Sequence, residues 1–222
     1  MVTSFDALLS TPFENGINAL CWQRVLVGDF DEVVEQLLVR EGITTLDDAL
    51  LNSLSLGIAG KAALEILLED QRLLRTAGLS PVLDCISAYP RDEEAGVVPT
   101  DVYSFHADSA PVATDTYLCS YTESSSEGVR NEDVLRHVDI PETRAALLKQ
   151  FGGEDDGDFL EYLSEHCYDL HYAPLPTAQP FSFGLGNLWR IAIQYPGSPL
   201  PPCIHRAPAT VPGRPPRLLL IS

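Results

Sequence analysis

Two short segments of this sequence carry side chains that could bind one metal ion together. The first is Phe105-His106-Ala107-Asp108, and the second is the run 204–208, which contains His205. Two imidazoles and one carboxylate form the ligand set that holds non-heme Fe(II) on one face and leaves other positions open for O2 and a co-substrate. His106 and Asp108 are two residues apart, so on a strand or at its end both can face the same ion. The sequence therefore predicts His106, Asp108 and His205 as metal ligands, and a structural role for each residue is the alternative.

A further candidate is Arg217, which opens the apolar run 217–222. An arginine that begins a strand beside the second histidine could form a bidentate pair with a carboxylate. The distal carboxylate of 2-oxoglutarate is the candidate ligand, and an ordinary ion pair is the alternative. Arg206 and Arg214 compete for this role. Arg206 is adjacent to His205 and should face away from the metal on a strand, whereas Arg214 lies in a turn rich in proline and glycine, so we rank Arg217 first.

His171 and Tyr172 are candidate substrate contacts. They end a segment that we expect to be helical, directly before a proline-rich stretch. Because an inserted segment can act as a lid over the mouth of a barrel, either side chain could touch a substrate, and a surface or packing role is the alternative. Cys203 lies two residues before His205, so on a strand it would share the same face and could border the site.

The hydrophobic pattern indicates which elements must position these residues. Helical periodicity extends over 29–38, 44–56 and 59–76, so the first eighty residues are expected to be largely helical. Short strands are expected at 82–89, 102–106, 114–121, 187–195, 203–206 and 217–221. A helical insertion is expected at about 141–172. This order predicts an α+β chain with one domain, 1–222, in which helical residues 1–80 pack on a double-stranded β-helix, or jelly roll, formed by about 81–222.

Charge and composition limit the classes of partner. The 222 residues include 32 acidic and 14 basic side chains, which gives a formal net charge of −18. Such a surface repels phosphate backbones and anionic lipid, so neither nucleic acid nor a membrane is expected as a partner. No apolar run approaches the ~20 residues that span a membrane, and the first residues lack the basic start of a signal peptide. With five scattered cysteines and no Cys-x-x-Cys, we expect a cytoplasmic protein with reduced thiols and no zinc site.

Taken together, the motifs resemble the Fe(II)/2-oxoglutarate-dependent oxygenase superfamily of the cupin-like group, and most closely a bacterial branch of it. The segments that carry the resemblance occur in order over most of the chain: Trp22-Gln23-Arg24, Phe105-His106-Ala107-Asp108, Thr116-Tyr117, His205-Arg206-Ala207-Pro208 and Arg217-Leu218-Leu219-Leu220. The resemblance implies a double-stranded β-helix, with His106, Asp108 and His205 as iron ligands and Arg217 as the 2-oxoglutarate anchor. It also implies a dioxygenase that hydroxylates or otherwise oxidises a small-molecule substrate with O2. Two alternatives stay open: an iron-dependent oxygenase of the same fold without 2-oxoglutarate, and a non-catalytic cupin-like binding module.

Overall fold

Two curled antiparallel β-sheets form the centre of the α+β structure. The computed structural model describes residues 1–39, 41–91, 96–209 and 213–222. The first sheet has the order β1-β10-β5-β12-β3-β2, with strands Ala19–Trp22, Leu188–Ala192, Asp115–Ser120, Arg217–Ile221, Val82–Ile86 and Ile43–Thr45. The second has the order β7-β8-β4-β11-β6-β9, with strands Val134–Arg136, His171–Pro174, Phe105–His106, Ile204–Arg206, Glu127–Val129 and Phe181–Ser182.

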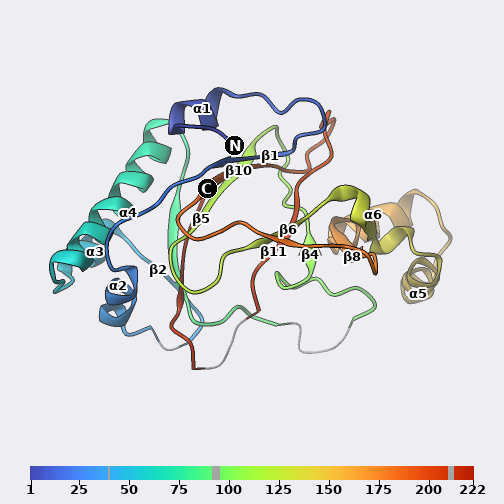
Figure 1. The fold of residues 1–222 in the computed structure, drawn as a ribbon. Coiled ribbons are helices and arrows are strands. Elements are labelled where there is room, and N and C mark those ends of the chain that lie inside the picture. The colour runs from blue at the N-terminus through green and yellow to red at the C-terminus, as the bar shows by residue number, and fades with distance from the viewer. Residues whose placement is uncertain (40, 92–95, 210–212) are drawn as a thin grey trace.

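Helices lie on two opposite sides of these sheets (Figure 1). The N-terminal group consists of α1 Phe5–Ser10, α2 Phe30–Leu37, α3 Asp48–Ser53 and α4 Ile58–Thr76. On the far side are α5 Pro141–Phe151 and α6 Gly157–Glu165, which fall inside the interval 141–172 and separate β6 from β9 in the chain. Short 3-10 turns occur at Asn131–Asp133, His137–Asp139 and Tyr168–Leu170. Among the described residues, no helix combines the length and apolar character needed to cross a bilayer.

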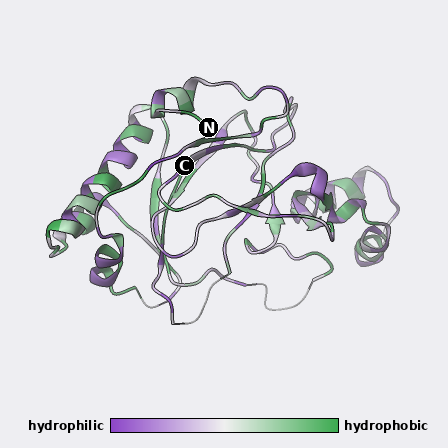
Figure 2. Ribbon diagram, viewed as in Figure 1, coloured by the Kyte–Doolittle hydropathy of each residue, from purple (hydrophilic) through white to green (hydrophobic). Residues whose placement is uncertain are grey.

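The alternation of β12 divides the core into two layers. Leu218 and Leu220 are fully buried against the N-terminal helices. The longest of these helices, α4, alternates between hydrophobic and hydrophilic residues along its length (Figure 2). Leu219 points to the other face and packs with Cys203, which directly precedes β11 of the second sheet. Since successive side chains of a strand point to opposite faces, Arg217 shares the face of Leu219. The Arg217 side chain is therefore directed into the space between the two sheets.

The N-terminal part departs from the largely helical expectation at two places. β1 pairs with β10 and β2 pairs with β3, so both strands extend the first sheet at its edges. These strands have only four and three residues, and so short a segment has no periodicity that would distinguish it from a loop.

The predicted strand 102–106 is also shorter in the structure, because β4 begins only at Phe105. The preceding residues form a turn in which the backbone N–H groups of Tyr103 and Ser104 donate to Oδ1 of Asp101, at 3.0 and 3.3 Å. An aspartate that binds the amides two and three residues later in this way favours a turn over an extended strand. This turn leads directly into the histidine of the candidate metal site.

Candidate metal centre

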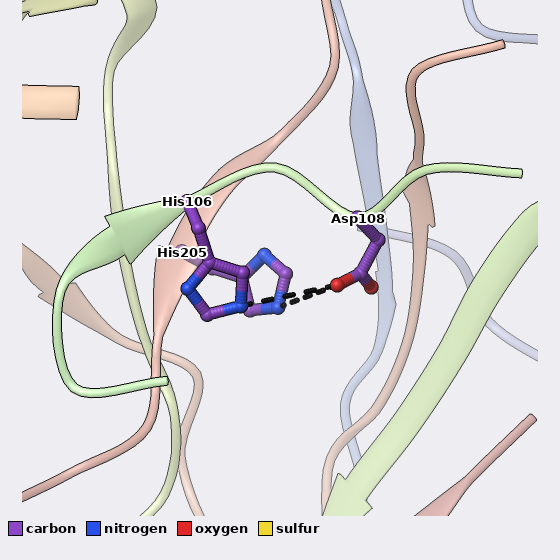
Figure 3. A group of neighbouring side chains, drawn as sticks. All are labelled: His106, Asp108 and His205. Atoms are coloured by element: carbon purple, nitrogen blue, oxygen red, sulfur yellow. Dashed lines mark ion pairs between the residues drawn. The ribbon is translucent and has the colours of Figure 1, made fainter. Parts of the chain in front are cut away.

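His106, Asp108 and His205 lie together at the paired strands β4 and β11 (Figure 3). His106 and His205 are directly opposite each other in this pair, and Asp108 follows β4 after one intervening residue. Oδ1 of Asp108 lies 3.9 Å from Nε2 of His106 and 3.8 Å from Nε2 of His205. Two donors bound to one ion at ~2.1 Å can be at most ~4.2 Å apart, so each of these pairs can share an ion. The structure thus brings the three predicted ligands to one point.

The hydrogen bonds behind these ligands set which atoms face the site. Nδ1 of His106 lies 2.8 Å from the Ser104 carbonyl oxygen, and Nδ1 of His205 lies 3.5 Å from that of Cys203. A carbonyl oxygen can only accept, so we assign the proton of each neutral imidazole to Nδ1, which leaves the Nε2 lone pair directed at Asp108. Partners of this kind fix the orientation of metal-binding histidines.

Asp108 has an outer partner of its own. The Thr116 hydroxyl of β5 donates to Oδ2 of Asp108 at 2.8 Å, so the other carboxylate oxygen, Oδ1, is the one that faces the two imidazoles. This bond links the second sheet, which carries the histidines, to the first sheet. In the sequence, Thr116 is part of the segment Thr116-Tyr117 that carries the family resemblance, and the residue pattern assigns it no chemical role.

The electrostatics of the site favour metal binding by His205. Burial lowers the pKa of this imidazole, and the positive charge of Arg217 acts in the same direction, while the charge of Asp108 raises it. A lowered pKa keeps the ring neutral, which is the form that binds a metal ion. Burial, with the charge of Asp108, raises the pKa of Cys203 to about 12. Cys203 therefore lies near the site as a protonated thiol.

Arg217 is buried between the sheets, and its partners among the described residues are hydroxyl groups. Its Nη1 donates to the Tyr89 hydroxyl at 2.9 Å, and its Nη2 donates to the hydroxyls of Ser120 and Ser126 at 2.7 and 2.8 Å. Nε is buried without a partner among the described residues, and no described carboxylate lies within ion-pair distance of this guanidinium. Burial lowers the pKa of Arg217, and the hydrogen bond and charge interaction with Tyr89 partly offset this lowering. A buried cation in this setting is suited to an anion supplied from outside the chain.

The two competing arginines already have carboxylate partners. Arg206 donates from Nε and Nη2 to Glu127 at 2.8 and 2.6 Å, and its guanidinium lies over the ring of Phe105, on the strand face opposite His106. The exposed Arg214 lies 3.5 Å from Glu123. These contacts distinguish both residues from Arg217.

His171 and Tyr172 belong to a strand, contrary to the expectation that they end a helical segment. They begin β8, after the 3-10 turn Tyr168–Leu170, and pair with His106 and Phe105 of β4. The strand forms because one edge of β4 offers backbone hydrogen-bonding groups that β11 does not use, and β8 pairs with that edge. His171 is buried on the face of His106, and its ring centroid is 5.7 Å from that of His106. A substrate contact by either residue stays a prediction.

Two pockets bear on the candidate site, and neither is lined by His106, Asp108 or His205. One, of about 690 Å³, is lined by Tyr103, Ser125 and Arg206 among others, and none of the metal ligands lines it. The other, of about 40 Å³, is lined by Tyr89 and Arg217. The smaller pocket matters more for the chemistry, because the buried Arg217 is one of its lining residues.

Chemically, two neutral imidazoles and one carboxylate can hold a divalent first-row metal, and this set with open positions is typical of non-heme Fe(II). Comparisons of the chain with models of protein families, with curated proteins and with solved structures found no match. The chemistry of the site is therefore inferred from its own geometry.

Proposed function

We propose that this protein is a non-heme Fe(II) oxygenase that uses 2-oxoglutarate and O2 to oxidise a small molecule. The observation that carries this proposal is the combination of the ligands His106, Asp108 and His205 with the buried Arg217, which has no described carboxylate partner. The ligand set leaves coordination positions for a co-substrate, and a guanidinium suits its distal carboxylate. Fe(II) and 2-oxoglutarate, when bound, would supply the oxidation of a C–H bond by O2.

The residues of the chain would contribute binding, orientation and exclusion of water. Thr116 orients the Asp108 carboxylate, and the lowered pKa of His205 keeps that imidazole available as a ligand near neutral pH. Arg217 would hold the distal carboxylate, with Tyr89 beside it. Apolar side chains of the layer between the sheets would limit water around the buried His205 and Arg217, which strengthens the charge interactions of these two groups.

We further infer that the two sheets form a double-stranded β-helix. Eight strands, β3, β4, β5, β6, β9, β10, β11 and β12, pair first with last: β3 with β12, β4 with β11, β5 with β10 and β6 with β9. These four pairs alternate between the first and second sheets. A long antiparallel hairpin folded over on itself in this way has the connectivity of a jelly roll. On this interpretation β1, β2, β7 and β8 are additions at the sheet edges.

The proposal is tested on protein purified without O2. We expect Fe(II) and 2-oxoglutarate together to produce a weak visible charge-transfer band, because both would be bound at one centre. His106→Ala should abolish the band, whereas His166→Ala, which changes an exposed histidine on the far helices, should leave it intact. Absence of the band in the unaltered protein, or its persistence in His106→Ala, would count against the proposal.

A second substitution separates the remaining alternatives. Arg217→Met should keep metal binding and lose the band that depends on 2-oxoglutarate, while Arg214→Met, at an exposed arginine, serves as the matched control. An oxygenase that does not use 2-oxoglutarate would keep full activity in Arg217→Met. A non-catalytic binding module would bind no iron and consume no O2, so metal analysis of the isolated protein decides that alternative.

A further inference from the structure

Three histidines form a row across neighbouring strands of the second sheet. His171 of β8 is paired with His106 of β4, which is paired with His205 of β11. Directly opposed residues of antiparallel strands point to the same face, and the ring centroids of successive histidines are 5.7 and 4.7 Å apart. The cluster with metal-ligand spacing includes His106 and His205 but not His171. The buried His171 therefore needs a role other than that of a ligand.

The contact that defines this role is a hydrogen bond to a serine. Nδ1 of His171 lies 2.7 Å from the hydroxyl oxygen of Ser104, which in turn lies 2.8 Å from the carbonyl oxygen of Asp101. A hydroxyl has one proton and a carbonyl can only accept, so both contacts are satisfied when Ser104 donates to Asp101 and His171 donates to Ser104. If the serine donates to His171 instead, its hydroxyl is still bound to β8.

Ser104 connects this bond to the metal centre. Its carbonyl oxygen is the group that accepts from Nδ1 of His106 at 2.8 Å. The serine belongs to the turn that begins at Asp101, directly before β4. A displacement of Ser104 would therefore move the acceptor that fixes both the orientation and the tautomer of the His106 ring.

We propose that His171 is a positioning residue for the metal centre, which acts on the ligand His106 through the hydroxyl and carbonyl of Ser104. The inference rests on the proposed function, because it concerns the same metal. Loss of a direct outer partner weakens metal binding by roughly 10- to 100-fold. Because His171 acts one residue further away, we expect about a 10-fold effect. A substrate contact at His171 would alter KM and leave metal affinity unchanged.

Substitutions at His171 separate the hydrogen bond from the packing. His171→Phe keeps the ring volume but removes the bond, whereas His171→Asn keeps a polar atom near the position of Nδ1. We expect the dissociation constant for Mn²⁺, measured by EPR titration, to rise about 10-fold in His171→Phe and to stay close to the unaltered value in His171→Asn. His166→Phe makes the same change at an exposed histidine and should have no effect. Equal affinity in His171→Phe, or equal weakening in both His171 variants, would overturn the proposal.

A double-mutant cycle tests the path through the serine. Ser104→Ala removes the same hydrogen bond, together with those that the hydroxyl donates to the carbonyls of Asp101 and Pro99, and leaves β8 unchanged, so it carries the test even where His171→Phe fails to fold. The double variant should bind Mn²⁺ no more weakly than Ser104→Ala alone, and additive losses would show that the two residues act independently.

The imidazole nitrogens of His106 provide a readout that does not need the metal. In metal-free protein, their ¹⁵N chemical shifts should report one tautomer with the proton on Nδ1, and Ser104→Ala should leave a mixture of tautomers. An unchanged single tautomer would overturn the positioning role. Failure of the unaltered protein to bind any metal would overturn the proposed function, and the ¹⁵N shifts would still decide whether His171 and Ser104 position this ring.

Discussion

Arg217→Met and Arg24→Met would each remove a buried guanidinium group, one beside neutral hydroxyls and the other beside a carboxylate. Arg24 is bidentate to Asp70, with Nη1–Oδ1 and Nη2–Oδ2 distances of 2.6 and 2.8 Å, and the two side chains are 9% and 3% exposed. Within the described ranges, Arg217 donates to three hydroxyls. Burial acts to lower the pKa of both groups, but the hydrogen bond and charge of Asp70 more than reverse this at Arg24. Arg24 has a counter-ion among the residues that the structure describes, whereas Arg217 has none there.

The expected losses of stability follow from what each substitution leaves behind. Arg24→Met leaves the Asp70 carboxylate buried and unpaired, which costs about 3–5 kcal/mol. Arg217→Met leaves neutral hydroxyls and removes a desolvated cation, so we expect the free energy of unfolding to change by no more than about 1 kcal/mol. For the affinity for 2-oxoglutarate we expect the reverse: Arg217→Met should lose more affinity than Arg24→Met. Two hydrogen bonds to a charged group contribute at least about 3 kcal/mol, so Arg217→Met should weaken binding by about 100-fold or more.

Urea unfolding of the metal-free variants measures the change in the free energy of unfolding. Calorimetric titration of Mn²⁺-loaded protein with 2-oxoglutarate measures the affinity for this co-substrate. At 100 times its dissociation constant for the unaltered protein, 2-oxoglutarate should stabilise that protein and any folded Arg24→Met by about 2.7 kcal/mol, and Arg217→Met by about 0.4 kcal/mol or less. If Arg217→Met were destabilised as much as Arg24→Met, Arg217 would be a structural cation. Binding of 2-oxoglutarate by Arg217→Met with undiminished affinity would refute the assignment of the anchor.

Two further predictions concern the carboxylate ligand and the pH dependence of stability. Thr116→Val keeps the side-chain shape but removes the hydrogen bond to Asp108, so calorimetric titration should show about 10-fold weaker Mn²⁺ binding, and unchanged affinity would argue against an orienting role. Burial lowers the pKa of His137 below its ordinary value of 6.5, so the unfolded chain binds this proton more readily than the folded one. The stability that this neutral histidine confers is complete above pH 6.5 and is lost as the pH falls toward the lowered pKa. His137→Asn should therefore lose less stability than the unaltered protein between pH 7 and 5 in urea unfolding, and parallel losses would contradict this.

The parts of the fold that the sequence predicts well are those with a long or uninterrupted pattern. The helix expected at 59–76 is α4, Ile58–Thr76, because its apolar stripe extends over many turns. The strand expected at 217–221 is β12, with the same bounds, because an unbroken apolar run follows two prolines. By contrast, β6, β8 and β9 have two to four residues each, and segments this short carry no period. Their positions depend on hydrogen bonding to strands far away in the chain.

The same distinction applies to the site. The types and spacing of His106 and Asp108 were sufficient to propose a ligand pair, although β4 ends at His106 and Asp108 lies beyond it. Chain spacing alone could not indicate that Thr116 and His171 would lie beside these candidate ligands. Thr116 approaches Asp108 from the other sheet, and His171 depends on the register of β8 against β4. Register of this kind is set by pairing across the sheet, which a single sequence does not show.

The surroundings of Arg217 become informative when they are compared with those of the other arginines. In a chain with 32 acidic side chains, nine of the described arginines lie within ion-pair distance of an aspartate or glutamate. Within that described part, Arg91 and Arg217 do not, and Arg91 is exposed. A buried arginine has more need of a counter-ion than an exposed one, because it has lost the solvation that water provides. With carboxylates so abundant, a buried arginine whose described partners are three neutral hydroxyls supports the proposal that a co-substrate supplies its carboxylate.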